Sequence, residues 1–125
     1  MKLNGRHIYL NLLQIRLPIA GVMSIAHRVS GVLMVLAIPL LIGLLQFSLA
    51  DAASFGQLKA WFGGWLGLAI LFLALWALLH HLLAGIRYFL LDLDIGIDKP
   101  HYRHSAWGVM LAAPLLAGLL TGVMR

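Results

Sequence analysis

Three long stretches of this 125-residue chain contain no Asp, Glu, Lys or Arg, and they constrain its fold more than any other feature. They cover 29–50, 60–86 and 104–124 and are 22, 27 and 21 residues long. A helix of about 20 apolar residues crosses the roughly 30 Å hydrocarbon core of a bilayer. Barrel strands instead alternate in polarity over about 10 residues, whereas these stretches are apolar throughout. The sequence therefore predicts an all-α integral membrane protein, a three-transmembrane-helix bundle.

The composition narrows the chemistry that such a bundle can carry. Hydrophobic residues make up 62% and charged residues 10% of the chain, whereas soluble domains have about 25% charged residues. No cysteine is present, so this chain supplies no disulfide, iron-sulfur ligand or thiolate metal site, and a redox centre would have to use histidine. The net charge of +5 comes from residues scattered beside the apolar stretches, which argues against nucleic acid as a partner.

The distribution of basic residues predicts the orientation. Four precede the first apolar stretch, one lies in the first loop, three lie around the second loop and one ends the chain: Lys2, Arg6, Arg16 and Arg28; Lys59; Arg87, Lys99 and Arg103; and Arg125. The positive-inside rule therefore predicts that the N terminus and the second loop face the cytoplasm or a mitochondrial matrix. We expect no signal peptide, and the N-terminal segment is too poor in Ser and Arg for a transit peptide, which favours a bacterial inner membrane over the mitochondrial one.

The chain is expected to form a single membrane-anchor domain over 1–125. It would comprise an N-terminal surface segment, 1–20, and transmembrane helices at about 21–49, 58–92 and 104–124. Asp51 and Ser54 are expected to cap or turn the first loop, while Gly96 and Pro100 interrupt the second. Small residues recur within the spans and permit close helix contacts, so partner subunits are expected.

Two adjacent histidines stand in the otherwise apolar segment "WALLHHLLAGIRYFLLD". Neighbouring helix positions point about 100° apart, so His80 and His81 cannot bind one metal ion together. His81 shares its face with Gly85, which leaves room for a flat macrocycle, whereas His80 suits a polar contact. Intramembrane ionisable groups usually mark a site, and the alternative is a neutral histidine bonded to a nearby carbonyl. His7, His101 and His104 are expected to be solvated.

A second set of polar residues lies in "SIAHRVSG" at the start of the first span. Ser24, His27, Arg28 and Gly31 have helical spacing and share one face. Arg28 can bind a carboxylate or donate to a quinone carbonyl, as Ser24 can, although Arg28 could also simply extend to the membrane surface. Arg28 and Arg87 should meet at one membrane face, with His81 about a turn and a half deeper. A haem fits this geometry, with its iron at the depth of His81. His27 and Arg28 would face its propionates, and His27 would lie too near the surface to be an axial ligand.

The two motifs resemble a known family. "LPIAGVMSIAHRVSGVLM" followed by "HLLAGIRYFLLD" is similar to the cytochrome b556 membrane-anchor subunit of succinate dehydrogenase, or complex II. Its hallmarks are S-x-x-H-R-x-[ST]-G at the start of the first helix and H-x-x-x-G-I-R-[HY] near the end of the second. The match covers nearly the whole chain. It departs near the N terminus, where Arg6 is followed by His7 and not by the family's proline.

The resemblance implies specific roles. His81 would be the axial ligand of haem b, with the second ligand on the companion small anchor subunit. Ser24 and Arg28 would help form the ubiquinone site, and His27 and Arg28 would contact the haem propionates. The flavoprotein and iron-sulfur subunits would be the soluble partners. Asp92 matches an acidic family position of open function, and Tyr88 is expected to have no ligand role.

Other functions stay open at this point. A haem-free structural anchor of a related quinol:fumarate reductase or another membrane complex would use His81 only as a hydrogen-bonding group. A small transporter or channel subunit is disfavoured because the chain lacks an intramembrane carboxylate and an inverted repeat.

Overall fold

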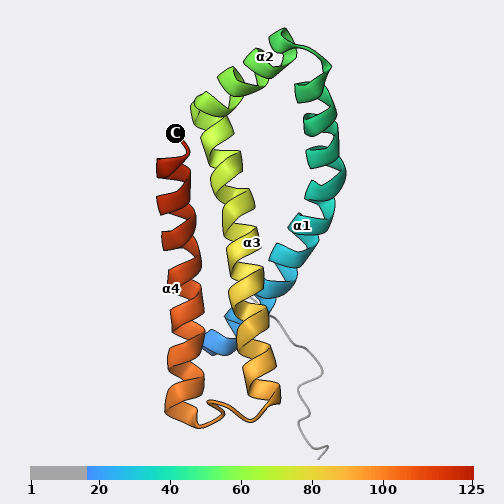
Figure 1. The fold of residues 1–125 in the computed structure, drawn as a ribbon. Helices are drawn as coiled ribbons and strands as arrows, with labels where there is room; N and C mark the ends of the chain where they lie inside the picture. Colours follow the sequence, from blue (N-terminus) through green and yellow to red (C-terminus); the bar gives the residue numbers. More distant parts are fainter. Residues whose placement is uncertain (1–16) are drawn as a thin grey trace, which may run out of the picture.

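The computed structural model describes residues 17–125 as four helices (Figure 1): α1 (Ile19–Ala50), α2 (Ala52–Gly63), α3 (Trp65–Asp92) and α4 (Lys99–Val123). Three of them, α1, α3 and α4, are long and apolar enough to cross a membrane. The expected all-α bundle with three membrane spans is confirmed. Most of the expected surface segment, 1–20, lies outside the described residues.

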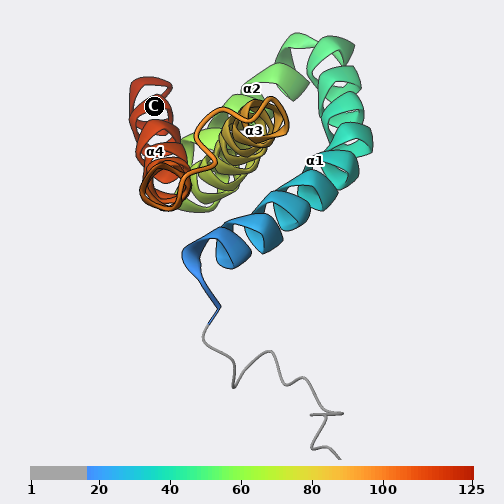
Figure 2. The same cartoon turned by 90° about the horizontal axis from the view of Figure 1, so that it is seen from below.

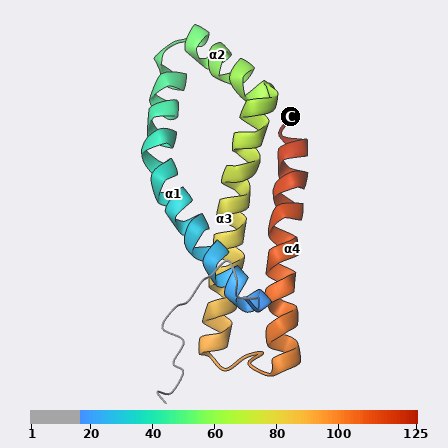
Figure 3. The same cartoon turned by 180° about the vertical axis from the view of Figure 1, so that it is seen from behind.

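The helices meet at one end of the bundle and separate at the other. Near its N terminus α1 crosses α3 and approaches α4; it then bows away, and α2 bridges the gap back to α3 (Figures 1 and 3). Viewed from below, α3 and α4 lie side by side while α1 runs obliquely past them (Figure 2). At about 1.5 Å per residue, the 32 residues of α1 span about 48 Å, more than a bilayer core, so α1 must tilt, bend or extend beyond that core.

The start of α1 and the connection between α3 and α4 lie at the same end, opposite the C terminus (Figure 1). Three spans in up-down-up order produce this arrangement. It places the basic residues around the second loop at the end where the chain enters α1. Which end faces the cytoplasm stays a prediction of the charge distribution.

The helix that was expected at 58–92 is divided into two helices at Gly64. The backbone of Gly64 is extended (φ −79°, ψ 161°), so α2 ends and α3 starts in a new direction. Asp51 caps α2 by accepting a 2.7 Å hydrogen bond from the Ser54 amide, which confirms the expected cap. This bond holds the pKa of Asp51 below its ordinary value because it stabilises the carboxylate. At only 12 residues, α2 is too short to span a bilayer.

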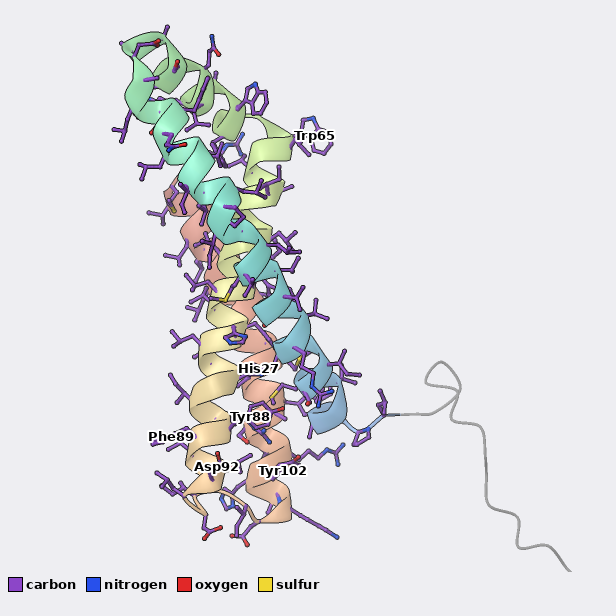
Figure 4. All side chains as sticks on the ribbon, turned by 90° about the vertical axis from the view of Figure 1, so that its right-hand side faces the viewer. His27, Trp65, Tyr88, Phe89, Asp92 and Tyr102 are labelled. Atoms are coloured by element: carbon purple, nitrogen blue, oxygen red, sulfur yellow. The ribbon has the colours of Figure 1, made fainter. Side chains whose placement is uncertain are left out.

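The joint between α2 and α3 depends on a close backbone approach at Gly67. A Cβ there would collide with the Trp61 carbonyl oxygen and come within 2.6 Å of the Phe62 Cα. Trp61 and Trp65, beside the joint, are largely exposed, and Trp65 projects away from the helices (Figure 4). Tryptophans commonly lie at the interface between membrane and water. The joint is therefore suited to that level of the bilayer.

We expect Gly67→Ala to destabilise the protein by about 1–3 kcal/mol, because the added methyl meets backbone atoms that no rotamer change can move. Thermal unfolding in detergent would measure the loss. Gly43→Ala is the matched control, since a Cβ at Gly43 meets nothing within 4 Å. Equal melting temperatures for the two variants would contradict the prediction.

The start of α4 differs from the expected boundary. The helix begins at Lys99, with Pro100 in its first turn, and not at 104. Proline is favoured there because the first helical amides need no intrahelical acceptor. His101 and His104 are therefore exposed residues of the first helical turns, although a loop was expected. The preceding turn uses Gly96 at φ 77°, a conformation that glycine adopts at low cost.

The core is small and lies where the helices converge. Met23, Ala84 and Ala106 form its buried cluster, one residue from each membrane-spanning helix. Further along the bundle, three alanines of α3 and α4 are buried: Ala77, Ala113 and Ala117. Such small side chains let helix backbones approach closely within lipid. The functional motifs of α1 and α3 are thereby held against each other at the convergent end.

Candidate functional site

A pair of stacked imidazoles forms the centre of the site, where α1 crosses α3. The ring centroids of His27 and His81 lie 4.1 Å apart and their planes differ by 14°. The Tyr88 ring is 5.3 Å from that of His27, tilted by 58°, and both residues lie in the half of the bundle nearest the α3–α4 connection (Figure 4). His27 was expected to lie nearer the membrane surface than His81, but the two rings are direct neighbours. Because α1 crosses α3 obliquely, equal distances along the two helices do not correspond to equal depths.

The hydrogen bonds of His81 both involve Nδ1. This nitrogen lies 3.1 Å from the backbone carbonyl oxygen of His27 and 3.4 Å from the Ser30 hydroxyl oxygen. The Ser30 hydroxyl itself donates to the same carbonyl at 2.8 Å. Since a carbonyl only accepts, the network assigns the proton of a neutral His81 to Nδ1. Nε2 then carries the lone pair, which is the form of imidazole that binds a metal.

His80 has different surroundings from His81. Its side chain is 1% exposed. The Trp76 ring stacks on it, with centroids 5.5 Å apart. Its Nε2 is buried and has no partner among residues 17–125. The polar contact expected of His80 stays a prediction.

Arg87 was expected only to mark the end of the second span, but it joins α3 to α4. It is 5% exposed. Its Nε donates to the Ser105 hydroxyl and one terminal nitrogen donates to the Tyr102 carbonyl, both at 2.9 Å. The guanidinium carbon lies 4.6 Å from the Tyr102 ring centroid, close enough for a cation–π contact. The sequence holds a signal for this site, because Tyr102 and Ser105 are three residues apart and share one face of α4.

Replacing Arg87 by leucine should destabilise the contact between α3 and α4. Hydrogen bonds from a charged donor are worth about 1.5–3 kcal/mol, so we expect a loss of at least that size and a lower melting temperature in detergent. Arg103→Leu removes an exposed cation from the same end of the bundle and serves as the control. A melting temperature for Arg87→Leu as high as that of Arg103→Leu would show that the contact contributes nothing measurable.

Ser24 and Arg28 do not join this packed centre. They lie one turn apart on α1, with Ser24 partly buried and Arg28 exposed. Neither side chain forms a hydrogen bond with another of the described residues. Asp92, at the end of α3, is also exposed. Over 17–125 no group of three or more His, Cys, Asp or Glu side chains is placed to hold a bare metal ion.

Comparison with known proteins decides the family. The model of the family described as "Succinate dehydrogenase/Fumarate reductase transmembrane subunit" matches residues 2–121. The chain belongs to this family. It is 37% identical to a protein of Coxiella burnetii over 94% of both chains, and 32% identical to one of Paracoccus denitrificans over 83% of this chain and 80% of the other. Both relatives are named succinate dehydrogenase cytochrome b556 subunit.

As a succinate dehydrogenase/fumarate reductase transmembrane subunit, the chain is a membrane component of an oxidoreductase complex. The resemblance inferred from the two motifs is confirmed. The structure brings His27 of the first motif against His81 of the second, while Ser24 and Arg28 form no hydrogen bond with the described residues. The first motif includes Ser30 but gave it no role, although its position three residues after His27 lets its hydroxyl reach that residue's carbonyl.

Proposed function

We propose that this chain is the haem b-binding membrane-anchor subunit of succinate dehydrogenase. It would anchor the flavoprotein and iron-sulfur subunits and form part of the ubiquinone reduction site. The observation that carries the proposal is the bonding of His81, because both contacts engage Nδ1 and leave Nε2 for iron. The names of the two relatives, each a cytochrome b556 subunit, support it.

The residues present fit a haem with one ligand from this chain. His81 would supply Nε2, and the companion small anchor subunit would supply the second axial ligand. A bound haem b provides a one-electron carrier. His27 Nε2, buried without a partner in the described part of the chain, and the Arg28 guanidinium would donate to the propionate carboxylates.

Ser24 and Arg28 are proposed as this chain's share of the ubiquinone site. A hydroxyl and a guanidinium one helical turn apart can donate together to a quinone carbonyl. Their position outside the packed centre suits a pocket that other subunits complete. Electrons from succinate would reach the quinone through the iron-sulfur subunit, with haem b nearby.

The proposed location is a bacterial inner membrane, with the N terminus and the α3–α4 connection in the cytoplasm. Both relatives come from bacteria. The basic residues at that end of the bundle support this orientation. The soluble subunits would then dock on the cytoplasmic face, close to Ser24 and Arg28.

One observation favours a second candidate, the haem-free structural anchor. The His27 ring stacks directly on His81, and a Cβ on Gly85 would lie 3.9 Å from His27 Nε2. The room that Gly85 was expected to leave for a macrocycle is thus next to the His27 ring. That side of His81 is therefore filled by the His27 ring, which suits a His81 that only packs and forms hydrogen bonds.

The reduced-minus-oxidised absorption spectrum of the purified, co-expressed complex separates the two candidates. The haem-bearing anchor predicts a sharp b-type α band after dithionite reduction. An intact complex from haem-replete cells without that band would establish the haem-free anchor instead.

A further inference from the structure

Three neighbouring features of α1 surround the His81 imidazole. They are the backbone carbonyl of His27, the hydroxyl of Ser30 and the absent side chain of Gly31. Ser30 is completely buried, so its hydroxyl cannot be serving the solvent. We refer to these three groups as the imidazole cradle.

Ser30 has two interactions that complement each other. Its hydroxyl hydrogen is given to the His27 carbonyl at 2.8 Å, which turns the oxygen's lone pairs towards other donors. The nearest donor is His81 Nδ1 at 3.4 Å. The proton on Nδ1 therefore has two acceptors, the carbonyl and the hydroxyl, and both disfavour the tautomer that would protonate Nε2.

Gly31 sets the position of the ring by sterics. A Cβ at this residue would lie 2.9 Å from His81 Cε1 and 3.2 Å from Nδ1, closer than real side chains pack. The imidazole therefore occupies the space that any other residue would fill. With a methyl group at Gly31, the ring would have to shift and its contacts with the carbonyl and hydroxyl would lengthen.

We propose that Ser30 and Gly31 are positioning residues for the haem ligand: they hold the His81 imidazole in one orientation, protonated at Nδ1, so that Nε2 points its lone pair at the iron. This inference rests on the proposed function. Outer contacts of this kind orient a metal-binding histidine and raise its basicity, and their loss typically weakens metal binding about 10- to 100-fold. An imidazole that donates from its far nitrogen also gives the iron more electron density, which lowers the reduction potential.

The chain supplies matched controls for both residues. Ser48 lies in the same helix and donates to the Leu45 carbonyl at 2.8 Å, the same local bond that Ser30 makes, but it is far along α1 from His81. Gly43, also in α1, has nothing within 4 Å of its Cβ position. Ser48→Ala and Gly43→Ala therefore reproduce the helix chemistry of Ser30→Ala and Gly31→Ala without touching the imidazole.

The experiment measures haem per assembled complex, the reduction potential of the haem and the electron paramagnetic resonance of its ferric form. We expect Ser30→Ala to keep haem but raise its potential and shift its low-spin signal, and Ser30→Thr, which retains a hydroxyl, to restore both. Gly31→Ala should weaken haem binding about 10- to 100-fold, so that the complex loses haem on dilution. If haem is kept, its low-spin signal should shift further than in Ser30→Ala. Both control variants should match the unmodified protein.

Two outcomes have separate meanings. If His81→Ala lost the haem signal while Ser30→Ala and Gly31→Ala matched their controls in all three measurements, the imidazole cradle would be refuted and the haem ligand retained. If His81→Ala itself kept the unmodified signal, the proposed function would fail, and the cradle with it.

Discussion

Replacement of His81 by alanine is expected to remove the b-type α band from the assembled complex. At the α1–α3 crossing, contacts at 3.1 and 3.4 Å fix Nδ1 of the His81 imidazole, which leaves its Nε2 for a metal. A methyl group cannot bind iron, so six-coordinate haem would be absent. Reduced-minus-oxidised absorption, normalised to the amount of complex, measures the loss.

His80→Gln is the matched control for this prediction. His80 is adjacent in sequence and buried, but its ring stacks on Trp76 and is not held by the imidazole cradle. Glutamine keeps a polar side chain at this position. We therefore expect the α band to persist in His80→Gln. An α band of normal size in His81→Ala would overturn the assignment, and a band lost only in His80→Gln would transfer the ligand role to His80.

The pattern of charges and apolar residues predicted the membrane spans well because lipid leaves few alternatives. A charge-free stretch of 21 or more residues can satisfy its backbone only as a helix, so α1, α3 and α4 follow from the sequence. The break at Gly64 did not follow. It depends on the close approach of Gly67 to the Trp61 carbonyl. The residues next to Trp61 and Gly67 in the sequence are all apolar, so they give no sign of this contact.

The functional side chains were recognised by spacing, but their mutual arrangement was not. Helical periodicity places His27 near Ser24 and Gly31, yet it gives no angle between α1 and α3. That crossing angle decides that His27 stacks on His81, and the residues buried where the helices converge, Met23, Ala84 and Ala106, carry no chemical signal of their own. The inward position of Arg87 was missed for the same reason, since its partner Ser105 belongs to a different helix.

Arg28→Leu is expected to lower succinate-dependent quinone reduction by at least about tenfold. Arg28 is exposed on α1 one turn from Ser24 and makes no hydrogen bond within the described part of the chain, so its donors are available to a quinone carbonyl. A hydrogen bond from a charged donor is worth about 1.5–3 kcal/mol, which corresponds to roughly a 10- to 150-fold effect. Reduction of an artificial dye by the soluble subunits should be unchanged, because that electron path ends before the membrane.

The control must separate loss of a specific donor from loss of a surface cation. Arg103→Leu also removes an exposed positive charge at the same end of the bundle and should retain quinone reduction. Arg28→Lys keeps the charge but not the planar fork of donors, so its activity should lie between those of the leucine variant and the unmodified protein. Parallel losses of quinone and dye reduction in Arg28→Leu would instead mean that Arg28 acts in holding the soluble subunits, and the quinone site would then have to be sought elsewhere in the complex.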